Sequence, residues 1–297
     1  MKRKLLHIIL LMTVCLPFAG AQVSYTNKAI LYYQENQYDK AMEYIDSALA
    51  NPKEMNEAYT WYVRGMIYKD HYKQFETPLA ESRSRIKSIE SFKKCIDLDA
   101  GKNEHTSNAM VNIKFLAGTY YNEMVKNLDT VNYEKAEPLY EKYKETMRLV
   151  DPKMDFTKND KEVYLFLGAQ ISRKFNFKKE GVTQKYFDMA ISVFKRVIAL
   201  DSNDCNAHYQ IAQLYYNYGV ETILSLDDTT PLDKVIEAQD KCVALFQKSL
   251  PHMKKAYQLS NCKSKKELVK ALMGIYYQLN EMDKYNDLNT QLQLIKE

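Results

Sequence analysis

The sequence predicts an all-α fold built from about six helical hairpins. Apolar residues recur at helical spacing, as in Ala190, Phe194 and Val197, and a short polar cluster, LDSND at residues 200–204, ends this run. A similar helix–turn–helix pattern returns along the chain. Because each predicted helix is too short to be stable alone, it must pack against its neighbour.

Two alternating patterns place these helices. The first helix of a hairpin carries a large residue, then a small one, then Tyr, as in WYVRGMIY (61–68), KFLAGTYY (114–121), VYLFLGAQI (163–171), YQIAQLYY (209–216) and ALMGIYY (271–277). The second helix carries a small residue with a large one four positions later, as in YDKAMEYIDSALANP (38–52), SIESFKKCIDLDA (88–100), KAEPLYEKYKETMRLVDP (135–152), AISVFKRVIALDS (190–202) and SLPHMKKAYQLSN (249–261).

These motifs resemble those of the tetratricopeptide repeat (TPR) family, and the resemblance covers residues 24–297, nearly the whole chain after its first residues. It implies an α–α superhelix, a TPR-like solenoid, in which the first helices line an inner, concave wall. No Gly-, Ser- or Pro-rich linker divides the chain, so we expect one solenoid domain over residues 22–297.

The spacing of the small positions distinguishes regular hairpins from lengthened ones. Ala29 and Ala41 are 12 residues apart, as are Met273 and Tyr285. The four hairpins between them have longer intervals, which predicts longer helices or inserted loops. The intervals between small positions are 23 residues (Gly65 to Ser88), 19 (Ala117 to Ala136), 22 (Gly168 to Ala190) and 37 (Ala212 to Ser249). In the longest, we expect one helix to run on through Pro251.

Small residues at the crossing of two helices allow the backbones to approach closely. Gly65 and Gly168 occupy this position on first helices, and Ala41 and Ala190 occupy it on second helices. Replacing one of them with Leu is expected to overpack the crossing, at a cost of about 1–3 kcal/mol.

The first residues predict export. Residues 1–21 combine a basic start, an apolar run from Leu5 to Leu16 and a small-residue ending, which is the layout of a secretory signal peptide cleaved before Gln22. An uncleaved anchor or a lipid on Cys15 is a less favoured alternative, because the run is short and Val14 does not suit a lipoprotein peptidase. We expect a periplasmic protein, free or associated with the envelope, with no stable membrane insertion after cleavage.

The cysteines after residue 21 are Cys95, Cys205, Cys242 and Cys262. Export permits disulfides, but there is no CxxC pair. Cys205 and Cys262 each precede a predicted helix in successive hairpins, about one unit apart, beyond the ~7 Å Cα limit for a disulfide. The sequence therefore favours free thiols.

Charge and motifs exclude several function classes. Of 42 basic residues three belong to the targeting segment, which leaves 39 against 38 acidic residues and no concentrated basic face for nucleic acid. His71, His105, His208 and His252 lack zinc-ligand spacing, and GxSxG, Walker and GxGxxG motifs are missing from the sequence. We therefore expect a protein that is not an enzyme, with no cofactor and no metal.

Tyrosine, with 24 residues, is the outstanding feature of the composition. In the TPR resemblance, inner-wall residues lie three before and one after the small position, and at the following turn. An aromatic stripe of this kind also serves packing between helices, and that alternative stays open. The partner-binding candidates on this wall are Tyr62, Met66, Lys114, Tyr121, Phe166, Tyr209, Gln213, Tyr216, Lys270 and Tyr277.

The leading hypothesis is a non-catalytic scaffold or adaptor that binds a peptide or protein on its concave face. The carboxylate clamp of some TPR proteins is not reproduced, because Val63, Leu165 and Ala271 stand at the corresponding positions. A second hypothesis is an accessory subunit of a secretion or outer-membrane assembly machine. A third, of another class, is a small-ligand-binding protein or enzyme that uses the inserted loops.

Overall fold

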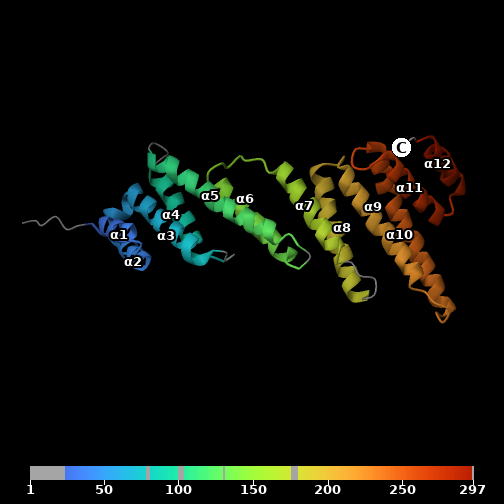
Figure 1. Ribbon diagram of the computed structural model, residues 1–297, viewed down its shortest axis with the longest axis horizontal. Helices are drawn as coiled ribbons and strands as arrows, with labels where there is room; N and C mark the ends of the chain where they lie inside the picture. The colour runs from blue at the N-terminus through green and yellow to red at the C-terminus, as the bar shows by residue number, and fades with distance from the viewer. Residues whose placement is uncertain (1–23, 78–80, 100–103, 130, 175–179, 296–297) are drawn as a thin grey trace, which may run out of the picture. The chain divides into compact units, whose positions relative to one another are not determined.

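The structure is a computed structural model that describes residues 24–77, 81–99, 104–129, 131–174 and 180–295. The expected signal peptide, residues 1–21 with Cys15, lies outside the described residues. Every regular element in these ranges is helical, and no strand occurs in them, so the predicted all-α class is confirmed (Figure 1). Among the described helices, none combines the length and the hydropathy that a membrane span requires.

The chain forms two compact units, the first ending at Ile113 and the second beginning at Lys114, within α5 (Glu104–Lys126). The prediction of one solenoid over residues 22–297 stays a prediction. The other elements of the first unit are α1 (Tyr25–Gln34), α2 (Tyr38–Ala48), the 3-10 turn η1 (Glu54–Asn56), α3 (Ala58–His71), the π-helical turn η2 (Tyr72–Glu76) and α4 (Arg83–Asp99). The second unit holds α6 (Tyr133–Arg148), α7 (Thr157–Ser172), α8 (Glu180–Leu200), α9 (Cys205–Leu224), α10 (Leu232–Leu259), α11 (Lys265–Gln278) and α12 (Met282–Leu294).

Consecutive helices pack as the predicted hairpins. In the first unit α1 packs on α2 and α3 on α4, and in the second unit α7 packs on α8, α9 on α10 and α11 on α12. The rings of Tyr121 and Tyr143, 5.2 Å apart, join α5 to α6 within the second unit. This pairing of neighbours is the arrangement that the TPR resemblance implies.

The two regular hairpins turn in the same way. Asn36 and Asn280 adopt left-handed backbone conformations, with φ of 58° and 56°, which asparagine tolerates better than most residues. The surrounding sequences, YYQENQYDK and YYQLNEMDK, match at six of nine positions. The equal intervals of 12 residues in the first and last hairpins thus correspond to one turn geometry.

Small residues mark the helix crossings, as predicted. A Cβ on Gly65 would lie 2.6 Å from the ring of Phe92, and one on Gly168 would lie 2.7 Å from that of Phe194. The Ser88 hydroxyl donates to the Gly65 carbonyl at 2.7 Å. Ala41 and Ala190 have no exposed surface. The close approach that the sequence predicts is therefore present in both units.

The longest hairpin, α9–α10, has two such crossings, of which the sequence predicts one. At the predicted small positions, the Ser249 hydroxyl donates to the Ala212 carbonyl at 2.7 Å. Two helical turns away, a Cβ on Gly219 would lie 2.6 Å from the ring of Phe246. As expected, α10 continues through Pro251 without interruption.

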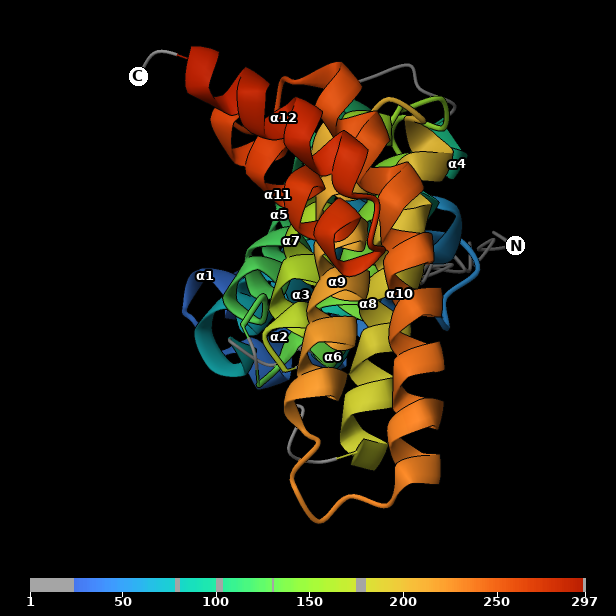
Figure 2. The same ribbon diagram turned by 90° about the vertical axis from the view of Figure 1, so that its right-hand side faces the viewer.

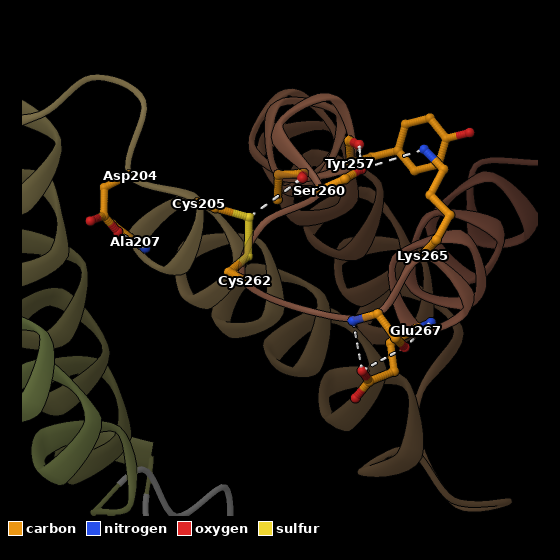
Figure 3. Close-up of a disulfide and its surroundings, with 10 residues drawn as sticks. Asp204, Cys205, Ala207, Tyr257, Ser260, Cys262, Lys265 and Glu267 are labelled. Atoms are coloured by element: carbon orange, nitrogen blue, oxygen red, sulfur yellow. Dashed lines mark hydrogen bonds between the residues drawn. A yellow bond between two sulfur atoms is a disulfide. The ribbon is translucent and has the colours of Figure 1, made fainter.

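Cys205 and Cys262 form a disulfide, so the prediction of free thiols was wrong for this pair (Figure 3). Their Cα atoms are 5.5 Å apart. The physical reason is that α10 returns antiparallel to α9, which brings the loop after α10 to the first residue of α9. The bond therefore closes the end of one hairpin rather than spanning the distance between two. Cys95 and Cys242 are free thiols, as predicted, and both are buried.

Candidate functional site

The predicted wall residues of the first unit are largely packing residues. The Tyr62 ring lies against Phe92 and His105, with ring centroids 5.9 and 5.4 Å away. The Met66 sulfur accepts a hydrogen bond from Lys69 Nζ at 3.3 Å. Both side chains are half-buried, so they present only part of their surface to a partner.

Three candidates near the start of the second unit do not form one cluster. Lys114 and Phe166 are exposed, and the Phe166 side chain keeps 48% of its surface accessible. Tyr121 is half-buried against Tyr143. No described cavity brings these three residues together.

Tyr209 lies in the core rather than on an open wall. It is 8% exposed and belongs to the cluster formed by α9, α10, α11 and α12. Its hydroxyl accepts a hydrogen bond from Gln213 Nε2 at 2.7 Å, and Lys263 Nζ lies 5.5 Å from its ring centroid. Burial, with a smaller contribution from Glu267, raises the pKa of Tyr209.

Tyr216, Lys270 and Tyr277 surround one cavity of about 330 Å³ in the second unit. Tyr216 lies on α9, the first helix of the hairpin α9–α10. Lys270 and Tyr277 lie on α11, the first helix of the following hairpin. Their convergence is the arrangement that the sequence-based rule for the inner wall predicts. It is the candidate functional site, and we call it the α9–α11 cavity.

Three further residues complete the lining of the α9–α11 cavity. Gly274 keeps it open, because a Cβ there would lie 3.1 Å from the Tyr216 hydroxyl. Met273 forms an apolar part of the wall, and Tyr285 reaches the cavity from α12. In the sequence pattern Met273 and Tyr285 stand at small positions of the last hairpin, which gives no signal that they line a cavity.

The cavity presents cationic and phenolic groups. Lys270 and Tyr277 are exposed, Tyr277 to 59%, and the ring centroids of Tyr277 and Tyr285 are 5.8 Å apart. Within the described residues, neither the Lys270 ammonium nor the hydroxyls of Tyr216, Tyr277 and Tyr285 have a hydrogen-bond or ion-pair partner. These groups can hold a carboxylate beside an apolar or aromatic side chain.

A larger cavity, of about 750 Å³, lies between α6, α7 and α8. Leu167 and Ile171 of α7 are among the apolar residues that line it. Arg196 borders it, pairs with Glu137 at 2.5 Å and stacks over the Tyr164 ring at 3.9 Å. Its cation is therefore already neutralised by an acidic neighbour. None of the predicted wall residues lies here.

In the described part of the chain, no three His, Cys, Asp or Glu side chains are arranged to hold a metal ion. The Nδ1 atoms of His208 and His252 are 3.0 Å apart. This pair joins α9 to α10 and lies outside the α9–α11 cavity.

No family model and no curated protein matches this chain. Solved structures with a similar helical arrangement exist at low TM-scores. A crystal structure of PilW, a type IV pilus biogenesis factor, matches with 17% identity over 92% of this chain and 93% of its own, at a TM-score of 0.29. A monomeric mutant of IFIT1 with Gppp-AAAA matches with 12% identity at 0.39, and the MamA protein with 18% identity at 0.20.

The coverage differs between these structures. The IFIT1 match covers 92% of this chain but only 60% of IFIT1, whereas the MamA match covers 75% of this chain and 95% of MamA. All three TM-scores are low, so these likenesses carry no conclusion about this chain.

Proposed function

We propose that this protein is a non-catalytic scaffold that binds a peptide or protein segment at the α9–α11 cavity. The observation that carries the proposal is that Tyr216, Lys270 and Tyr277 line one cavity. They come from α9 and α11, the first helices of two successive hairpins. Their ammonium and phenol groups have no partner within the described residues. Tyrosines offer a large contact area and a hydroxyl at low entropic cost, which suits peptide recognition.

The chemistry of the cavity favours a segment with an acidic residue next to an apolar or aromatic one. Lys270 supplies a charge for a carboxylate, and the rings of Tyr277 and Tyr285 supply a surface for the neighbouring side chain. Among its lining residues no nucleophile is paired with a general base, so the site supports binding rather than catalysis.

We also propose that the protein acts in the bacterial envelope. The Cys205–Cys262 disulfide supports this location, since such bonds persist in oxidising compartments and are rare in the cytosol. It agrees with the expected signal peptide at residues 1–21. Fractionation of cells, with N-terminal sequencing of the exported form, tests both expectations, and a cytosolic protein that retains Met1 would contradict them.

Peptide selection followed by titration tests the binding site. Peptides selected on the wild-type protein from a random phage library are expected to combine Asp or Glu with an aromatic residue. Tyr277→Ser is expected to weaken their binding about tenfold, and Lys270→Gln to weaken it and reduce its salt dependence. Lys254→Gln, at an exposed lysine on α10, is the matched control and leaves binding unchanged. If Tyr277→Ser, Lys270→Gln and Lys254→Gln all bound the peptides equally well, the α9–α11 cavity would not be the binding site.

A further inference from the structure

The first half of α10 extends beyond α11 and α12, which lie beside its C-terminal end. α10 has 28 residues, whereas α11 has 14 and α12 has 13. At 1.5 Å per residue, α10 is about 20 Å longer than either. Figures 1 and 2 show α10 continuing well past the ends of α11 and α12. Only its second half, from Leu250 onwards, belongs to the core cluster that α11 completes.

An apolar stripe follows the outer side of this extended half. Leu232, Ile236 and Val243 are 74%, 51% and 43% exposed. Their spacings of four and seven residues place them within about 40° of one another around the helix. We call these three residues the α10 stripe. Such a row of large apolar residues on an exposed helix is the pattern that a partner helix covers.

The stripe is separate from the side of α10 that packs on α9. Cys242, Leu245 and Phe246 are buried, and Phe246 lies over Gly219 of α9. Leu250, by contrast, follows Val243 by seven residues, on the same side as the stripe, and packs in the cluster with α11. The α10 stripe thus continues the surface that α11 already covers. A further helix that packed on the stripe would extend this coverage along α10.

Negative charge borders the stripe. Asp233 and Asp240 are exposed and have no ion-pair partner in the described part of the chain. Asp240 lies one turn after Ile236. The nearby cations are engaged elsewhere: Lys234 Nζ lies 2.7 Å from a Glu237 oxygen, and Lys241 donates to the Tyr218 hydroxyl at 3.1 Å.

We propose that the α10 stripe docks an amphipathic helix of another protein whose apolar side is flanked by Lys or Arg. The apolar stripe supplies the contact area, and Asp233 and Asp240 supply the charge complementarity. A second copy of this chain offers the same acidic border and therefore gains no complementary pair. Anionic lipid would be repelled by the same two carboxylates.

Two designed helical peptides test this proposal. Both are fluorescein-labelled, about five turns long, with leucines at i, i+4, i+7 and i+11; the flanks are Lys in one and Glu in the other. Binding to the full-length protein is measured by fluorescence anisotropy at low and high salt. The Lys-flanked peptide is expected to bind about tenfold more tightly than the Glu-flanked one, and salt is expected to reduce the difference.

Substitutions at exposed positions distinguish the two parts of the surface. Ile236→Gln combined with Val243→Gln is expected to weaken the Lys-flanked peptide about tenfold. Asp233→Lys combined with Asp240→Lys is expected to reverse the preference in favour of the Glu-flanked peptide. Leu294→Gln, at another exposed apolar position of the second unit (77% exposed), is the control and keeps the wild-type preference.

Three results would overturn the proposal. The first is equal affinity for the two peptides, or no binding of either. The second is a wild-type dimer in sedimentation that the Ile236→Gln, Val243→Gln variant dissociates, because the stripe would then pair with a second copy. The third is flotation of the wild-type protein, but not of that variant, with phosphatidylcholine vesicles.

Discussion

The ring of Phe194 occupies the place where a side chain of Gly168 would begin: a Cβ there would lie 2.7 Å from two ring atoms. Phe194 is fully buried in the core of the second unit. The ring therefore has little room to move, and the glycine is required by packing rather than by backbone conformation. Phe92 over Gly65 repeats this relationship in the first unit.

Gly168→Ala is predicted to destabilise the protein. Alanine favours a helix over glycine by up to ~1 kcal/mol, but displacement of the buried Phe194 ring costs about 1–3 kcal/mol, so the net effect is a loss. Gly118→Ala is the matched control, since nothing lies within 4 Å of a Cβ there. It is predicted to stabilise α5 by about 0.5–1 kcal/mol. Urea unfolding followed by circular dichroism measures both, and equal signs would contradict the packing argument.

Replacement of both Cys205 and Cys262 with serine is predicted to lower the free energy of unfolding by about 2–4 kcal/mol, because the disulfide restricts the unfolded chain. Reductant should destabilise the wild type similarly and leave the double variant unchanged. In the protein without residues 1–21, which carries Cys15, alkylation of the unfolded, unreduced chain is expected to label Cys95 and Cys242 alone. Labelling of all four would show that the bond is not formed.

In the histidine pair that joins α9 to α10, a backbone carbonyl determines the position of one ring hydrogen. His208 Nε2 lies 3.2 Å from the Ser202 carbonyl, which only accepts, so Nε2 carries the hydrogen. The Nδ1 atoms of His208 and His252 are 3.0 Å apart, within hydrogen-bond distance of each other. Burial, with His208 and Lys195 nearby, lowers the pKa of His252 to about 4.

Acidification is therefore predicted to destabilise the protein through His252. The unfolded imidazole takes up a proton near its ordinary pKa of 6.5, whereas the folded one does so only near 4. Between these values the unfolded state binds more protons, so stability rises with pH and is lost as the pH falls. His252→Gln removes this contribution, and its melting temperature should fall less than that of the wild type between about pH 7 and pH 5. Equal falls would contradict the assignment.

The hairpins could be predicted because their determinants are local. Helical periodicity, polar breaks and a small residue every few turns are visible in one stretch of sequence, and they placed Gly65 opposite Ser88 and Ala212 opposite Ser249. Gly219 was missed because its neighbours, Tyr218 and Val220, do not reproduce the pattern of a small position.

The site was predicted only in part, because side-chain exposure depends on distant segments. Periodicity assigned Tyr209 and Tyr216 to the same wall, but Tyr209 is buried in the core cluster with α10, α11 and α12, whereas Tyr216 lines a cavity. The approach of Cys262 to Cys205 likewise depends on where the loop after α10 returns. The exposure of the α10 stripe could not be predicted, because it depends on how much shorter α11 is than α10.

Asp46→Asn is predicted to destabilise the first unit, because Asp46 neutralises a buried cation. Arg64 is 7% exposed, and its Nε lies 2.8 Å from an Asp46 oxygen, while the Tyr68 hydroxyl donates to the other oxygen at 2.7 Å. Burial raises the pKa of Asp46, but hydrogen bonds from Tyr68 and Arg64 outweigh it and leave the pKa lowered. The loss is expected to be about 1–3 kcal/mol, since the arginine keeps its buried charge without a full counterion.

Asp97→Asn is the matched control for this substitution. Asp97 pairs with Lys93 at 2.7 Å on the exposed side of α4, where an i,i+4 pair contributes only about 0.3–0.5 kcal/mol. Urea unfolding near neutral pH compares the two variants with the wild type. Because the pKa of Asp46 is lowered in the folded protein, its contribution is present above the ordinary carboxyl pKa and is lost as the pH falls through the folded value. The difference between Asp46→Asn and the wild type should therefore shrink in acid, and a difference that is independent of pH would assign the effect to packing instead of charge.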